Sequence, residues 1–139
     1  MKISSGTINL KTKGNTDIFN LTHEVSIFIE NANIKEGNVL LFVPGSTGAI
    51  TTIEFESGVL DDLKQAIERL IPKNIPYKHD LRWGDGNGYS HVRASFFGPS
   101  LTIPLINGKM LLGTWQQIVF IDFDNRPRDR KILIQIIGK

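Results

Sequence analysis

The pair Asn107-Gly108 constrains the fold of this chain more than any other short segment. It separates two apolar-rich segments, Leu101 to Ile106 and Lys109 to Leu112. Asn followed by Gly best satisfies the positive φ angles of a two-residue type I′ turn, so the pair predicts a β-hairpin. The chain then predicts two more strands with a turn between them: Gln117 to Phe123, Asp124 to Pro127 and Lys131 to Ile137. The C-terminal half is therefore expected to be antiparallel.

The N-terminal half mixes helical and strand patterns. Apolar residues at helical spacing predict three helices, the first with Thr22 as N-cap, the second capped by Ser57 and the third ended by Gly98. Alternating or continuously apolar segments predict strands, and the run from Val39 to Val43 is of the kind buried on both faces, with Ala49 to Phe55 as its partner. The expected elements are strands 2–11, 39–43 and 49–55 and helices 22–32, 57–70 and 90–97. Early mixing followed by antiparallel strands indicates an α+β fold with two to three helices.

Length and composition limit the class of protein. With 139 residues the chain is expected to form one domain, residues 1–139. It has no cysteine, so a metal must be held by His, Asp, Glu, Asn or water. No apolar stretch is long enough to span a membrane and no signal peptide is evident, so we expect a cytoplasmic protein without a membrane partner. The strand 131–137 is apolar on both faces, and a second subunit could cover one of them.

Charge is distributed unevenly along the chain. Residues 1–70 carry six Lys/Arg and nine Asp/Glu, whereas residues 71–139 carry ten and five. The formal net charge is only +2, which does not suggest nucleic-acid binding. The second half is therefore the part expected to bind an anion, such as a small phosphorylated metabolite.

The segment from His79 to His91 holds the main candidates for chemistry. His79, Asp85 and His91 are spaced by six residues around a segment with three glycines, which can fold back and bring the three together. They could bind a divalent metal, with Asn87 or Glu54 as a further oxygen ligand, or act in acid/base catalysis. The alternative is structural: two histidines that cap loop carbonyls, with Asp85 in an Asx turn.

Other polar groups are weaker candidates. Ser46 and Thr47 follow a buried strand and could hold a phosphate, although an ordinary turn is the favoured interpretation. Arg126, Arg128 and Arg130 would lie on one side of an extended segment and could meet a phosphate bidentately, or only be solvated charges at the end of a hairpin. Gln116 could orient a polar substrate, or be a buried amide that only satisfies backbone groups. We add Arg82 and Asn87 of the glycine-rich segment to the predicted substrate-binding residues.

Five segments in order resemble the YjbQ-like family, often called the secondary thiamine-phosphate synthase family. They are the strand from Thr47 to Glu54, Tyr77-Lys78-His79, the acidic loop to His91, Leu112-Gly113-Thr114-Trp115-Gln116, and the Arg-rich turn. The resemblance covers almost the whole chain. It implies a mostly antiparallel split sheet, a homotrimer, and a site that can hold a divalent metal, Mg²⁺ or Zn²⁺.

The resemblance also implies an activity and roles for individual residues. The activity is the joining of a hydroxymethylpyrimidine diphosphate to a thiazole phosphate, with release of pyrophosphate. Its catalytic residues would be His79, His91, Glu54 and Gln116. Many members have a histidine where this chain has Gly45, which removes one nitrogen ligand. We therefore keep two alternatives: a different metal-dependent hydrolase, and a trimeric ligand-binding protein without turnover.

Overall fold

The chain forms two antiparallel sheets and four helices, and the computed structural model describes all of residues 1–139. The larger sheet has the strand order β1-β8-β3-β5-β6, and the smaller sheet has the order β2-β7-β4. The strands are β1 (Lys2–Thr12), β2 (Asp17–Asn20), β3 (Gly37–Phe42), β4 (Gly48–Ile53), β5 (Ser100–Ile106), β6 (Lys109–Met110), β7 (Gln117–Asp122) and β8 (Arg128–Gly138). The helices are α1 (Thr22–Ala32), α2 (Ser57–Leu70), α3 (Lys78–Trp83) and α4 (Gly88–Phe97).

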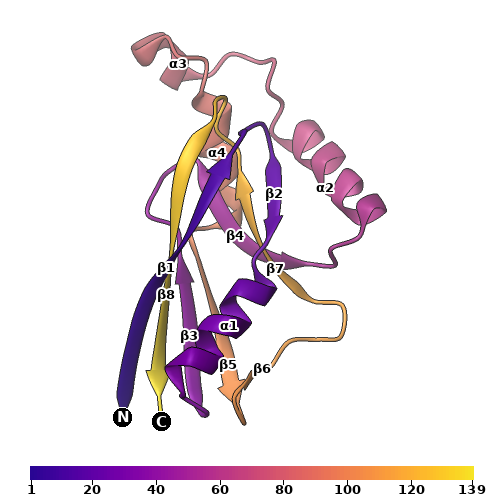
Figure 1. The fold of residues 1–139 in the computed structure, drawn as a ribbon. Coiled ribbons are helices and arrows are strands. Elements are labelled where there is room, and N and C mark those ends of the chain that lie inside the picture. Colours follow the sequence, from indigo (N-terminus) through magenta and orange to yellow (C-terminus); the bar gives the residue numbers. More distant parts are fainter.

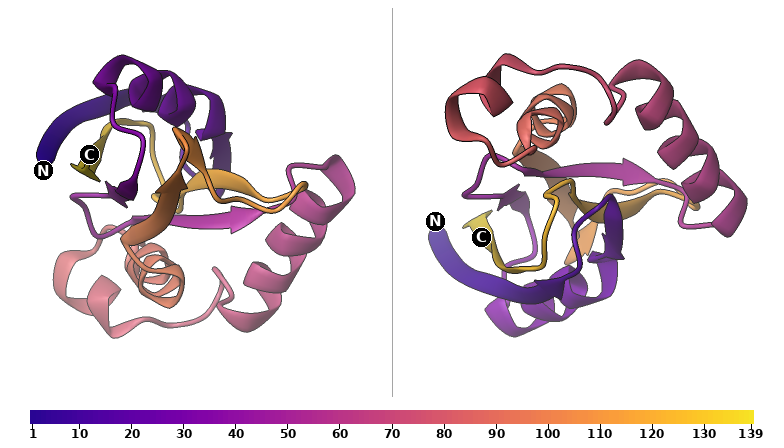
Figure 2. Two further views of the ribbon diagram at one scale, coloured as in Figure 1. Left: turned by 90° about the horizontal axis from the view of Figure 1, so that it is seen from below. Right: turned by 90° about the horizontal axis from the view of Figure 1, so that it is seen from above.

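The strands lie between helix α1 and the other three helices. Figure 2 shows α1 on one side of the strands and α2, α3 and α4 on the other. The larger core joins α1 to both sheets through residues such as Val25, Leu41 and Phe120, and the smaller core joins α2 and α4 to the other face of β4 and β7. The three-stranded sheet is thus covered on both faces. None of the helices has the length and apolar character that crossing a membrane requires.

The two ends of the molecule differ. Residue-by-residue pairing of β1 with β8 places both chain termini at one end of the larger sheet, whereas α3 lies at the opposite end (Figure 1). Asp17 and Gly48 both pair with Asp122, so the segments 13–16, 44–47 and 123–127 meet at that opposite end. These loops and helices surround the candidate site.

Several sequence predictions are confirmed. The α+β class and the antiparallel sheets are as expected. Asn107 and Gly108 have φ angles of 51° and 76°, and Ile106 pairs with Lys109, as a type I′ hairpin requires. Helix α4 starts two residues earlier than predicted and ends before Gly98 as predicted.

The pairing of strands was partly predicted wrongly. Strands β3 and β4 belong to different sheets, and so do β7 and β8, although each pair is joined by a short loop. Within one chain β3 and β8 each have one partly exposed face, since Phe42 is 37% exposed and Ile137 is 45% exposed, and the cover by a second subunit stays a prediction. Strand β2 and helix α3 were not predicted, because a four-residue strand and a six-residue helix carry little periodicity.

The predicted helix caps are also corrected. Leu21 is the N-cap of α1, and the Thr22 hydroxyl instead accepts a hydrogen bond from the Ile118 amide at 2.9 Å. Helix α2 is capped by Glu56, whose carboxylate accepts hydrogen bonds from the amides of Gly58 and Val59. These two bonds lower the pKa of Glu56. A carboxylate at the positive end of the helix replaces the predicted Ser57 hydroxyl.

Candidate active site

A buried carboxylate at the end of β7 fixes the position of an arginine. Asp122 is fully buried, and it accepts hydrogen bonds from Arg130 Nε and Nη2 at 2.8 Å each. The Thr12 hydroxyl and the Asp124 amide donate to the same carboxylate. The hydrogen bonds to Asp122 raise the pKa of Arg130, so the guanidinium stays charged. Two parallel hydrogen bonds define the plane of this guanidinium, which can therefore present its remaining nitrogen in a fixed direction.

Asp124 lies beside this pair and is only partly satisfied. Its Oδ2 accepts hydrogen bonds from the Thr47 hydroxyl at 2.9 Å and from Arg128 Nε at 3.1 Å. Burial acts to raise the pKa of Asp124, but the bonds from Thr47 and Arg128 outweigh it and the pKa lies below its ordinary value. The other oxygen, Oδ1, is buried and makes no hydrogen bond of good geometry. The side chain of Asn87 lies near enough to the carboxylate to help lower its pKa, so Asn87 is the polar neighbour that the chain itself offers to Asp124.

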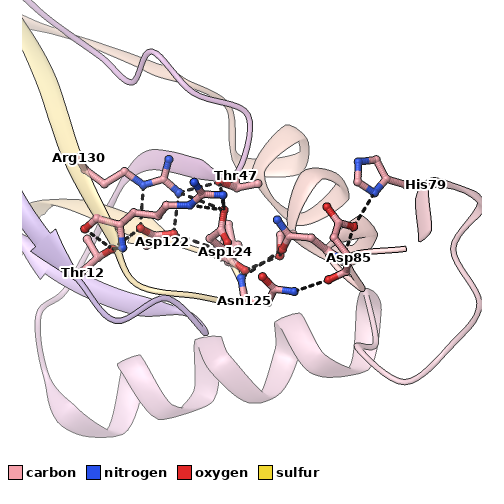
Figure 3. A network of polar contacts seen from close by, with 12 residues as sticks. Thr12, Thr47, His79, Asp85, Asp122, Asp124, Asn125 and Arg130 are labelled. Carbon is pink, nitrogen blue, oxygen red and sulfur yellow. Dashed lines mark hydrogen bonds and ion pairs between the residues drawn. The ribbon is translucent and has the colours of Figure 1, made fainter. Parts of the chain in front are cut away.

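Asp122 and Asp124, the acidic pair, are followed in the chain by Asn125, and hydrogen bonds from Asn125 reach the segment between α3 and α4. The Asn125 amide donates to Asn87 Oδ1 at 3.2 Å, and Asn125 Nδ2 donates to the Asp85 carbonyl at 2.8 Å. Asn87 is buried, and its side chain also accepts from the Ser90 hydroxyl. Figure 3 shows the network running from Arg130 to His79. The two ends of the site therefore form one connected arrangement.

His79 lies among carboxylates. Its Nδ1 is 3.5 Å from Asp85 Oδ1 and 3.7 Å from Asp80 Oδ1, and it is buried without a hydrogen-bond partner. One ligand atom from each residue lies within 4.8 Å of the others. Ligands of a tetrahedral zinc ion are about 3.4 Å apart. The two distances from His79 Nδ1 are close to this value, so these residues could hold a divalent cation, and an imidazole nitrogen among the ligands would favour zinc.

The predicted metal ligands are only partly brought together. His79 and Asp85 are neighbours as predicted, but the third member of the cluster is Asp80. The ring of His91 packs against that of His79, with centroids 4.5 Å apart and planes tilted by 39°. The structural alternative is also partly confirmed, because Asp85 Oδ1 accepts a hydrogen bond from the Asn87 amide as in an Asx turn. Neither histidine caps a loop carbonyl.

His91 lines a cavity between α4 and the loop that joins β3 to β4. This cavity has a volume of about 300 Å³ and is lined by residues that include Gly45, Ser46 and His91. A Cβ atom at Gly45 would lie 3.2 Å from Arg130 Nη1, the guanidinium nitrogen that makes no hydrogen bond within the chain. The glycine thus leaves this nitrogen accessible. Ser46 and His91 line this cavity and Arg130 Nη1 lies next to Gly45 at its wall, and a cation, a hydroxyl and an imidazole are groups that could bind an oxyanion.

Glu54 and Gln116 lie elsewhere, so their prediction as part of the histidine site is wrong for a single chain. Glu54 is exposed just beyond β4, and Gln116 is exposed just before β7. Gln116 Nε2 donates to the Thr52 hydroxyl, and its Oε1 accepts from the Gly113 amide. Because Ile53 pairs with Gln117 whereas Gly48 pairs with Asp122, the two groups are about 20 Å from the acidic pair along the strands.

The predicted substrate-binding residues divide into two groups. Thr47, Asn87 and Arg128 are all part of the network around Asp124, and Ser46 lines the neighbouring cavity. Arg82 is exposed on α3, and its guanidinium carbon lies 5.5 Å from the centroid of the Trp83 ring. Arg82 is therefore not joined to the rest of the site. The interpretation of Arg128 as a solvated charge is wrong, because it pairs with Asp124 at 3.0 Å.

Three residues of the site were not predicted: Asp80, Asp122 and Asp124. Arg130 was predicted with Arg126 and Arg128 as a possible phosphate ligand, and it is instead paired with Asp122 through Nε and Nη2. For two of the three unpredicted residues the sequence did contain a signal. Asp122 and Asp124 interrupt an otherwise apolar segment, and a buried carboxylate needs a cationic partner. The arginines that follow in the chain supply that partner. Asp80 has no such signal, because only the formation of α3 turns it toward His79.

The fold and site together define a class: α+β proteins with antiparallel sheets and a His- and acid-lined site where the loops of the two sheets meet. The family model described as "UPF0047 protein YjbQ-like" matches residues 6–139, and the chain belongs to this family. A UPF0047 protein of Methanothermobacter thermautotrophicus is 37% identical over all of this chain and 95% of its own. YugU of Bacillus subtilis is 33% identical over 95% of this chain and 98% of its own.

Solved structures have the same fold. A protein from Sulfolobus solfataricus, described as being of unknown function, superposes with a TM-score of 0.89 at 28% identity, covering 99% of this chain and all of its own. A YjbQ/UPF0047 protein from Clostridium acetobutylicum gives a TM-score of 0.86 at 35% identity over 94% of this chain and 98% of its own. The expected family and fold are thus confirmed, and the members are uncharacterised proteins. The similarity does not show thiamine-phosphate synthase activity.

Proposed function

We propose that this protein is a metal-dependent enzyme that acts on a small phosphorylated metabolite. The observation that carries the proposal is His79 Nδ1, which is buried without a hydrogen bond and lies 3.5 and 3.7 Å from the carboxylates of Asp85 and Asp80. A cation held there would supply Lewis-acid stabilisation of phosphate oxygens. Residues of the chain would bind the substrate and transfer protons.

The neighbouring groups are suited to binding and proton transfer. Arg130 Nη1 and the Ser46 hydroxyl can donate hydrogen bonds to a phosphate in the cavity beside Gly45. His91 borders the same cavity, so it can exchange a proton with a bound substrate. Arg128 is half-buried and already paired with Asp124, and it would position Asp124 rather than bind the substrate itself.

The thiamine-phosphate synthase reaction is the specific transfer that we propose to test first, on the strength of the family resemblance. Purified protein would be mixed with hydroxymethylpyrimidine diphosphate, thiazole phosphate and either Mg²⁺ or Zn²⁺, and thiamine phosphate would be measured by chromatography. We expect product from the unaltered chain and at least a hundredfold less from His79→Ala, which removes the proposed metal ligand, and from His91→Ala, since a general acid/base group contributes about 10²–10⁴ to rate. Equal product from the unaltered chain and both variants would refute this activity.

A metal-dependent phosphoester hydrolase is the second candidate. The cavity beside His91 is lined by small and polar residues, and the imidazole is the only aromatic group in it. A pyrimidine ring would find no other aromatic side chain to stack on, whereas a phosphate ester needs only the donors described above. Release of inorganic phosphate from a panel of phosphate monoesters, with no product from the paired precursors, would favour this candidate.

Metal binding can be tested separately from activity. The protein would be produced without a polyhistidine tag, stripped with chelator, reloaded with zinc and analysed by elemental mass spectrometry. We expect about one zinc per chain, and its loss in His79→Ala. His23→Ala is the matched control, because His23 is exposed on α1 and lies outside the cluster. Zinc retention by His79→Ala at the level of the His23→Ala control would contradict the proposed metal site.

We also propose a homotrimer in the cytoplasm. The outer face of the larger sheet exposes Ile3, Phe42, Ile106 and Ile137, and this supports burial against another copy of the chain. Such an assembly could bring Glu54 or Gln116 of one subunit to the histidine site of another. Light scattering coupled to gel filtration should give three times the 15.6 kDa chain mass. A trimer that binds a phosphorylated ligand without consuming it would favour the ligand-binding alternative.

A further inference from the structure

Helix α4 carries a second polar face that the proposed enzyme does not use. Tyr89 and Arg93 are four residues apart, so they lie on the same side of the helix, whereas His91 faces another side. Both line a separate cavity of about 260 Å³. The other lining residues come from the turn after β1 and from the region of α2: Asn15, Thr16, Lys64, Glu68 and Lys73.

The guanidinium of Arg93 is buried, but its three nitrogens differ in how well they are hydrogen-bonded. Arg93 is 4% exposed, and its Nε and Nη2 donate to the Ile71 carbonyl at 3.0 and 2.8 Å. Nη2 also donates to Glu68 at 2.6 Å. Nη1 has only one long contact, 3.5 Å to the Thr16 hydroxyl. Nη1 carries two N–H groups but has only this one weak acceptor, so at least one N–H of the buried cation lacks a hydrogen-bond partner.

Tyr89 adds a second unsatisfied group at the same place. The residue is 2% exposed, and its hydroxyl is buried with no hydrogen-bond partner in the protein. Two cations lie over the ring, with Arg93 Cζ at 4.8 Å and Lys73 Nζ at 5.6 Å from its centroid. Buried tyrosine hydroxyls ordinarily have a partner. One oxyanion in the cavity could accept from both Tyr89 and Arg93.

The charge of the lining is positive. Lys64, Lys73 and Arg93 carry three positive charges against the single negative charge of Glu68, which leaves +2. Both oxygens of Glu68 are already occupied, one by the Lys73 amide at 3.1 Å and the other by Arg93. Neither lysine forms a salt bridge, so their ammonium groups remain available for an anion.

We propose that this cavity is a binding site for a small oxyanion of the phosphate type, held by Arg93 Nη1, the Tyr89 hydroxyl and the two lysines. The volume is smaller than that of a drug-sized site, which suits a phosphate carrying at most a small organic group. The site does not depend on the proposed enzyme, since it shares no residue with the histidine cluster or with the cavity beside Gly45.

Nuclear magnetic resonance can test the proposal with inorganic phosphate as the probe. Backbone amide spectra of the ¹⁵N-labelled protein would be recorded during a phosphate titration at constant ionic strength, with chloride as the balancing anion. We expect saturable shifts at Thr16, Lys64 and Lys73. Tyr89→Phe keeps the ring and removes one donor, and it should weaken binding about tenfold. Lys73→Met should weaken it by a similar factor.

Two controls make the result specific. Lys131→Met removes an exposed charge on β8 outside the cavity and should leave the affinity unchanged. His91→Ala should also leave it unchanged, even if it abolishes catalysis, which separates this site from the proposed enzyme. Sulfate should compete with phosphate. Absence of saturable shifts, or equal affinity in Tyr89→Phe, Lys73→Met and the unaltered chain, would overturn the proposal and leave an ordered water as the partner of Tyr89.

Discussion

Substitution of Asp122 by Asn should reveal how strongly the site depends on one buried ion pair. Asp122 is fully buried, and Arg130, its partner, has a side chain only 12% exposed. The variant removes the negative charge and leaves the guanidinium with only the more distant Asp124, whose Oδ2 is 3.9 Å from Nη2, as a counter-ion. Breaking a buried pair in this way costs about 3–5 kcal/mol. That loss would be a large part of the 5–15 kcal/mol, roughly, by which domains are stable.

The assay is urea unfolding followed by circular dichroism, with the free energy of unfolding extrapolated to water. It would be repeated at several protein concentrations, because an oligomer makes the transition depend on concentration. Asp129→Asn is the matched control: Asp129 is exposed one residue before Arg130 and forms no salt bridge. We expect the control to change stability by less than about 0.5 kcal/mol. If Asp122→Asn cost no more than Asp129→Asn, Arg130 would not be held as described.

Two further predictions concern pH and packing. The pKa of Asp124 is lower in the folded chain than the ordinary value of about 4, so its contribution to stability is present above that value and is lost as the pH falls through the folded pKa. The free energy of unfolding measured against pH should therefore fall below about pH 4, and less steeply in Asp124→Asn. Gly48→Ala would place a Cβ 2.7 Å from Phe120 Cε1 in the core and should cost about 1–3 kcal/mol by thermal unfolding. An unchanged melting temperature would contradict that contact.

The features that the sequence predicted correctly are those set by residues close together in the chain. The hairpin at Asn107-Gly108 depends on two adjacent φ angles, and the long helices depend on one apolar stripe each, so a short window contains the whole signal. Sheet membership is different. Whether β8 continues from β7 in the same sheet is decided by its pairing with β1, more than a hundred residues away in the chain. No local pattern reports that choice.

The residues of the candidate site also divide into those that the sequence could identify and those that only the fold brings together. His79, His91 and Asp85 could be picked out because their residue types are rare and their spacing surrounds glycines. Their third partner could not, since Asp80 comes close only because α3 forms. Glu54 and Gln116 were proposed from their residue types and from the resemblance, and strand register places them at the other end of β4 and β7. Sequence thus located the segment that carries the candidate site more reliably than it named the residues that come together there.

Gly88 is the residue on which the geometry of this site depends most. A Cβ there would lie 2.7 Å from Tyr77 Cβ and 3.2 Å from His79 Cβ, atoms that move only with their backbone. The Gly88 amide also donates to Asp80 Oδ1 at 2.9 Å. Gly88→Ala should therefore push α3 away from α4, lower stability by about 1–3 kcal/mol and weaken zinc binding by His79 and Asp80.

Gly84→Ala is the control for this prediction. A Cβ at Gly84 meets nothing within 4 Å, although the φ of 66° is unfavourable for alanine, at a cost of about 1 kcal/mol. Both variants would thus lose some stability, but only Gly88→Ala should reduce the zinc content and separate the His79 and His91 rings. Equal zinc binding by the two variants would show that close packing of α3 on α4 is not what assembles the cluster. The segment from His79 to His91 would then be the flexible loop that its glycines suggest, and not a pair of helices held in contact.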